Sequence, residues 1–218
     1  MTGTVALWTL LHVLVLVYWL GGDLGAYYTS RFVYDGARPV PARGLAAKIL
    51  SDVDMAPRVC LLLAFPTGFA LANAKGWIAV HPIFVIAAFM LAGLWIMLAF
   101  VLHMDGGSPL LAKVDFGMRC ALVAALGGVG LAALTGEVAL PRFLALKLLV
   151  LAFAVVMGLL IRTMLRPFRP AFGRLLAEGG SPEVDAALRA PIARARPFVL
   201  GIWAALIAAT WLGITTPT

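Results

Sequence analysis

Six long, unbroken apolar runs constrain this chain more than any other feature of its sequence. They cover residues 5–24, 59–74, 82–102, 116–136, 143–164 and 198–215. A helix needs about 20 apolar residues to cross a bilayer, and only helices or closed barrels satisfy their backbone polar groups there. The runs lack the apolar–polar alternation of barrel strands. The sequence therefore predicts an all-α membrane bundle of about six transmembrane helices, with residues 1–218 as a single domain.

Composition and charge narrow the class of protein further. Hydrophobic residues make up 63% of the chain and charged residues 12%, whereas an ordinary soluble domain carries about 25% charged residues. This balance excludes a soluble globular enzyme, a disordered chain and a disulfide scaffold. A net charge of +7 would suggest nucleic acid as a partner of a soluble protein. Here we expect the lipid bilayer as the partner and no nucleic acid.

The positions of the basic residues predict how the helices are oriented. Fourteen of the 17 Lys and Arg residues lie in or beside the first, third and fifth connections, and the second and fourth hold one each, Lys75 and Arg142. Basic loops stay on the cytoplasmic side of a membrane. We therefore expect both termini outside. The frequent use of Ala, Arg and Leu is typical of a protein of the bacterial inner membrane.

Two of the predicted cytoplasmic connections contain helix signals of their own. Residues 42–53 follow two prolines and predict a short surface helix. Ser181 followed by Pro182 is a helix start, with serine as the cap and proline in the first turn. We expect this second helix to end near Arg189, because Pro191 interrupts it.

Ionisable residues inside the apolar runs are the strongest candidates for a functional site. His12 lies in the first run and Lys147 in the fifth. At 1.5 Å per residue, His12 lies roughly 10 Å and Lys147 roughly 7 Å from the outer surface. The two are therefore predicted at similar height in the outer half of the membrane. Structural roles stay open for both: His12 can donate to a backbone carbonyl, and Lys147 can extend to the interface.

The neighbours of His12 favour a planar cofactor. Trp8, His12, Val15, Trp19 and Asp23 follow one another at helical spacing and share one stripe. A histidine with tryptophans one and two turns away suits haem, so His12 and Trp19 are candidate cofactor residues. His81, just before the third run, could approach His12 from the outer side or serve only as an interfacial polar residue.

Acidic residues gather near the predicted cytoplasmic ends of the first two runs. Asp23, Asp52, Asp54 and Arg58 are close in this region. We expect them to form ion pairs with Arg31 and its neighbours.

Several short motifs resemble the HemJ-type protoporphyrinogen oxidases and, more loosely, the CopD-like membrane proteins. Leu11-His12-Val13 through Tyr18-Trp19 resembles the histidine and tryptophan pattern of that family's first helix. The segment from Lys147 to Arg162 resembles its lysine helix. Further similarities lie in the arginine and aromatic run Arg31-Phe32-Val33-Tyr34, in Arg58 with Pro66, and in Pro197 and Pro217 around the last helix.

The resemblance implies a small helical membrane protein with b-type haem. In that family a histidine binds the haem, a lysine is functionally required, and protoporphyrinogen IX is oxidised in a reaction coupled to the respiratory chain. Carried over to this chain, His12 is the ligand of the haem iron, and Lys147 and Arg58 are the catalytic candidates. The family has four helices, so residues 82–136 are an expected inserted hairpin.

Three functional hypotheses follow. The leading one is a membrane haem b protein in which Lys147 is a ligand, a proton donor or a propionate partner, and electrons pass to or from quinone or a membrane redox partner. The second is a cofactor-free accessory subunit of a larger membrane complex. The third is a CopD-like copper transport protein that uses Met90, Met97 and Met157. A homo-oligomer is compatible with each.

Overall fold

The computed structural model describes residues 3–104 and 108–216, and it confirms the all-α prediction. The chain is 87% helical, with no strand among the described residues. Among the described residues, six helical segments are long and apolar enough to cross a membrane, so this is a multi-pass membrane protein. The helices are α1 (Gly3–Val33), α2 (Val40–Val53), α3 (Met55–Ala74), α4 (Pro82–Met104), α5 (Pro109–Thr135), α6 (Arg142–Met164), α7 (Phe168–Glu178) and α8 (Pro182–Thr215).

Four helices form the centre of the bundle. Helix α1 packs along α3 and also contacts α8, while α6 packs along α8. These four helices meet in a cluster of buried apolar residues, to which each of them contributes. The cluster consists of Val15, Trp19, Cys60, Leu61, Val155, Ile202 and Leu206. The stripe predicted on the first helix therefore faces the interior at Val15 and Trp19.

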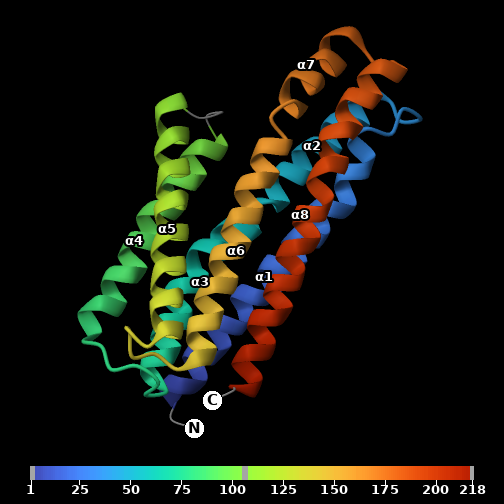
Figure 1. The fold of residues 1–218 in the computed structure, drawn as a ribbon. Coiled ribbons are helices and arrows are strands. Elements are labelled where there is room, and N and C mark those ends of the chain that lie inside the picture. The colour runs from blue at the N-terminus through green and yellow to red at the C-terminus, as the bar shows by residue number, and fades with distance from the viewer. Residues whose placement is uncertain (1–2, 105–107, 217–218) are drawn as a thin grey trace.

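Helices α4 and α5, which correspond to the expected hairpin 82–136, lie on one side of this centre (Figure 1). Helix α4 packs against α3, and α5 packs against α6. Part of the predicted hairpin turn, residues 105–107, lies outside the described residues, as does Pro217. That the hairpin is an insertion stays a prediction.

The two ends of the bundle differ in structure. The beginning of α1 and the end of α8 lie together at one end, and α2, α7 and the beginning of α8 lie at the other, which we call the cap end (Figure 1). Buried Ala171 and Leu175 of α7 pack there against Val184 and Leu188 of α8. The cap end carries the connections predicted to be cytoplasmic, and the orientation itself stays a prediction.

The short helices differ in part from the sequence-based prediction. Helix α2 forms where a helix was expected, but it packs against α1 and runs almost directly into α3. Ser181 caps α8 as predicted, because its side chain accepts a hydrogen bond from Val184 N at 3.3 Å. The expected break at Pro191 is wrong, since α8 continues through Pro191 and Pro197. Pro191 and Ile192 are buried in this stretch, and packing on neighbouring helices offsets the missing backbone hydrogen bond.

The expected ion pairs with Arg31 are also wrong. Asp54 pairs with Arg58, and Asp52 pairs with Lys48 at 2.6 Å and with His103 at 3.3 Å. Each of these carboxylates has a basic side chain one turn away on the chain, which is the closest available partner. The Arg31 guanidinium instead lies 3.7 Å from the centroid of the Tyr28 ring.

The crossing of α1 and α3 depends on one glycine, and its neighbour offers a matched control. A Cβ atom at Gly22 would lie 2.5 Å from Pro57 Cδ, whereas nothing lies within 4 Å of one at Gly21. We expect Gly22→Ala to lower the free energy of unfolding by about 1–3 kcal/mol, because the helices must move apart. Gly21→Ala should be neutral or stabilising, since alanine favours a helix. Thermal unfolding in detergent measures both, and equal effects would contradict this description of the crossing.

Candidate functional site

His12 lies between α1 and α3, held by a hydrogen bond between two side chains. Its Nδ1 atom is 2.9 Å from Oγ1 of Thr67, whose hydroxyl is also 2.6 Å from the carbonyl oxygen of Leu63. Gly68 makes room for the ring, because a Cβ atom there would lie 3.0 Å from His12 Cε1. The imidazole is thus oriented by a side chain rather than by the backbone carbonyl that the sequence left as an alternative.

Lys147 lies on the interior side of α6, against α8. A Cβ atom at Gly213 would lie 2.7 Å from Lys147 Nζ, so the glycine leaves space for the ammonium group. His12 and Lys147 both lie in the half of the bundle opposite the cap end, His12 in the first third of α1 and Lys147 in the first turns of α6.

The donor atoms around His12 fit an axial haem ligand. Among the described residues, Nε2 of His12 has no hydrogen-bond partner, while Nδ1 is engaged by Thr67. A ligating histidine is usually oriented in this way, through a hydrogen bond at its other ring nitrogen. Lys147 supplies a positive charge that an acidic group of a ligand, such as a haem propionate, can neutralise.

An apolar groove of about 490 Å³ begins beside Thr67. It runs between α1, α3 and α4, and its lining includes Leu11, Leu14, Val59 and Phe89. Its volume falls within the range of small-molecule sites, about 300–1,000 Å³. Thr67 lines the groove, whereas His12 is not among its lining residues.

Three other predicted site residues lie elsewhere. Trp19 is 3% exposed and packs in the central cluster, two helical turns or roughly 10 Å from His12 along α1. His81 is exposed before α4, and its Nδ1 accepts a hydrogen bond from the backbone N–H of Ile83 at 3.3 Å. Arg58 lies near the cap end of α3 and pairs with Asp54. Arg58 is therefore remote from His12. His12 bonds to Thr67, and the stretch of α3 between Arg58 and Thr67 separates the two sites.

The methionines considered for copper do not converge. Met90 and Met97 are 63% and 66% exposed on α4, whereas Met157 of α6 packs beside Gly201 in the interior. In the part of the chain that the structure describes, no three His, Cys, Asp or Glu side chains are grouped as metal ligands.

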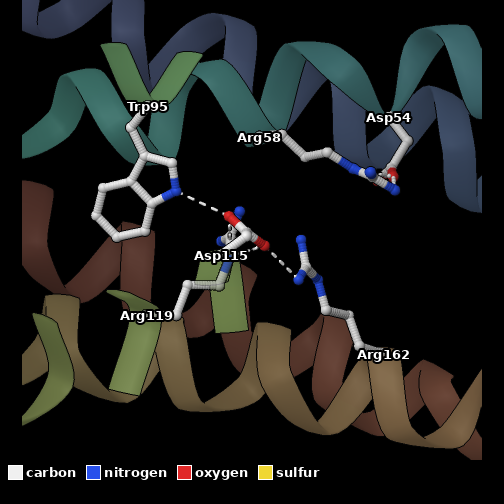
Figure 2. Close-up of polar contacts among 6 residues, drawn as sticks. All are labelled: Asp54, Arg58, Trp95, Asp115, Arg119 and Arg162. Carbon is white, nitrogen blue, oxygen red and sulfur yellow. Dashed lines mark hydrogen bonds and ion pairs between the residues drawn. The ribbon is translucent and has the colours of Figure 1, made fainter. Parts of the chain in front are cut away.

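A buried ionic cluster at the cap end was missed by the sequence reasoning (Figure 2). Asp115 of α5 is 0% exposed and accepts hydrogen bonds from Trp95 Nε1 at 2.8 Å and from Arg162 Nη1 at 2.5 Å. Arg119 Nε donates to the same carboxylate at 3.1 Å. The cluster therefore joins α4, α5 and α6.

One sequence signal could have revealed this cluster. Asp115 and Arg119 stand four residues apart at the beginning of the 116–136 run, a spacing that places them on one helix face. Arg58, Arg119 and Arg162 were taken as charges in or beside connections, but each lies within a helix near the cap end. Arg119 is buried in its ion pair with Asp115, while the side chains of Arg58 and Arg162 remain partly exposed.

Comparisons with known proteins leave the family resemblance as a prediction. No protein-family model, no curated protein and no solved structure matches this chain.

Proposed function

We propose that this protein is a b-type haem protein of the bacterial inner membrane, in which His12 would bind the haem iron. The observation that carries the proposal is the orientation of His12, whose Nδ1 atom is held by Thr67 while Nε2 is left for a metal. The bound haem would supply one-electron redox chemistry. Lys147 would hold a propionate or donate a proton, since it lies on the interior side of α6 in the same half of the bundle as His12.

The remaining roles follow from the positions of the other candidates. Trp19 stabilises the central cluster two turns from the ligand, and His81 and Arg58 belong to the two ends of the bundle. We propose a membrane quinone or a redox protein as the electron partner. The groove beside Thr67 supports a quinone, because its apolar lining suits an apolar molecule. Oxidation of a protoporphyrinogen-type substrate is proposed from the sequence resemblance.

An absorption spectrum of the purified full-length protein tests the proposal. We expect a Soret band and, after reduction with dithionite in alkaline pyridine, the bands of haem b at about one haem per chain. A colourless protein that also takes up no added haem would contradict the proposal. Stable co-purification of other subunits with that colourless protein would instead favour an accessory subunit.

The hydroxyl of Thr67 should affect haem binding without contacting the iron. We expect Thr67→Val to weaken haem affinity by about 10- to 100-fold, as loss of a group that orients a metal ligand does. Titration of haem into the protein measures this change. Thr210→Val is the matched control, because the Thr210 hydroxyl bonds only to Leu206 of its own helix among the described residues, at 2.7 Å. Equal affinities of the two variants would contradict the role of Thr67.

A further inference from the structure

Three guanidinium groups from three helices converge near the cap end. Arg58 comes from α3, Arg119 from α5 and Arg162 from α6, and Figure 2 shows Arg119 and Arg162 at Asp115, with Arg58 beside Asp54 in the same region. Arg119 Nε and Arg162 Nη1 donate to the same carboxylate, that of Asp115, so these two guanidinium groups lie close together. These cations are held together at the edge of a membrane, where charge is costly to bury.

The carboxylates in this cluster do not balance the arginines. Arg119 and Arg162 share the single carboxylate of Asp115, while Asp54 is paired with Arg58. The group formed by Asp115, Arg119 and Arg162 therefore keeps one positive charge in excess.

Hydrogen-bonding capacity is also left over. Arg119 is only 5% exposed, and its buried Nη2 atom has no hydrogen-bond partner among the described residues. A buried donor without an acceptor is unfavourable. The side chains of Arg58 and Arg162 are each 39% exposed, so an acceptor can reach the cluster from outside the bundle.

The depth of the cluster matches that of lipid phosphates. Arg162 lies 20 residues beyond Arg142, the first residue of α6, which is about 30 Å along a helix and equals the thickness of the hydrocarbon core. Arg58 is three residues after the first residue of α3. The arginines therefore lie at one boundary of the membrane, where basic sites between helices bind anionic headgroups.

We propose that Arg58, Arg119 and Arg162 form a binding site for the phosphate of an anionic phospholipid headgroup. Guanidinium groups bind phosphate oxygens through paired, charge-assisted hydrogen bonds. A phosphate here neutralises the excess charge and supplies the acceptor that Arg119 lacks. A free phosphate ion offers the same chemistry, but the position at the membrane boundary favours a lipid as its source.

Native mass spectrometry of the full-length protein in detergent tests this site. We compare how strongly the protein retains phosphatidylglycerol and phosphatidylcholine that carry the same acyl chains. We expect the wild type to retain the anionic lipid about tenfold more strongly, a difference equal to about 1.4 kcal/mol. Arg162→Gln should abolish this preference, and Arg162→Lys, which keeps the charge but not the paired donors, should retain part of it.

Arg174→Gln is the matched control, because Arg174 is an exposed arginine on α7 paired only with Glu178 among the described residues. It removes the same charge and should leave the lipid preference unchanged. Circular dichroism shows that each variant keeps its helices. Equal retention of the two lipids by the wild type, or an unchanged preference in Arg162→Gln, would overturn the proposal. Inorganic phosphate is tested for thermal stabilisation of the lipid-free protein. If it stabilises the protein in an Arg162-dependent way and no lipid preference is found, the ligand is a free phosphate ion, which would overturn the proposal of a lipid.

Discussion

Replacing Asp115 with alanine should destabilise the bundle more than any other single change considered. The carboxylate is fully buried and accepts hydrogen bonds from Trp95, Arg119 and Arg162. Its removal leaves the buried Arg119 guanidinium without its acidic partner. Breaking a buried ion pair in this way costs about 3–5 kcal/mol. Unfolding of the purified protein in detergent, followed by loss of helical circular dichroism, measures the change.

Two further variants separate the buried charge from a general effect of losing a carboxylate. Asp35→Ala removes an exposed carboxylate that pairs with Arg38, and such surface pairs contribute about 1 kcal/mol or less. The double variant Asp115→Leu and Arg119→Met removes both buried charges and should recover much of the lost stability. An Asp115→Ala protein as stable as Asp35→Ala would contradict the importance of the cluster.

Arg43→Ala should loosen the cap end while leaving the membrane helices folded. Arg43 of α2 is 1% exposed, and its Nε donates to the carbonyl oxygen of Val33 at 2.8 Å. Its Nη2 donates to Asp185 of α8 at 2.6 Å. The side chain therefore links the end of α1 to α2 and α8, and its loss should cost about 3 kcal/mol, as for other buried ion pairs.

Limited trypsin digestion measures this loosening, because the cap end is rich in arginine. We expect faster cleavage between α6 and α8 in Arg43→Ala than in the wild type, with the hydrophobic fragments still helical. Lys48→Ala is the control on the same helix, since the ion pair of Lys48 with Asp52 is exposed. If both variants are digested at the same rate, Arg43 does not hold the cap end together.

The membrane helices could be predicted because their signal is local. Each apolar run is close to the length of one crossing, and each lies within one helix of the structure apart from Gly136, the cap residue after α5. The ends were harder to predict, since α1 continues nine residues past Leu24 through mixed polar and aromatic residues. The passage of α8 through Pro191 depends on packing against neighbouring helices, and a proline in the sequence does not reveal that packing.

The two polar sites also differ in how far the sequence alone reveals them. His12 and Lys147 are isolated ionisable residues inside apolar runs, so they could be identified from the sequence alone. Their contacts with Thr67 and Gly213 come from other helices and became visible only in the fold. Asp115 and Arg119 stand at the end of a run, where charged residues are normally solvated. Only the packing of α4 and α6 around them shows that they are buried.

Haem retention by two histidine variants tests whether His12 binds the haem iron. His12→Ala removes the proposed axial ligand, whereas His81→Ala changes an exposed histidine whose Nδ1 bonds to the beginning of its own helix. Both proteins are purified in parallel, their helices are checked by circular dichroism, and their Soret absorbance per chain is compared with the wild type. We predict that His12→Ala loses the band while His81→Ala keeps it. A Soret band of wild-type intensity and position in folded His12→Ala would show that His12 does not bind the haem iron.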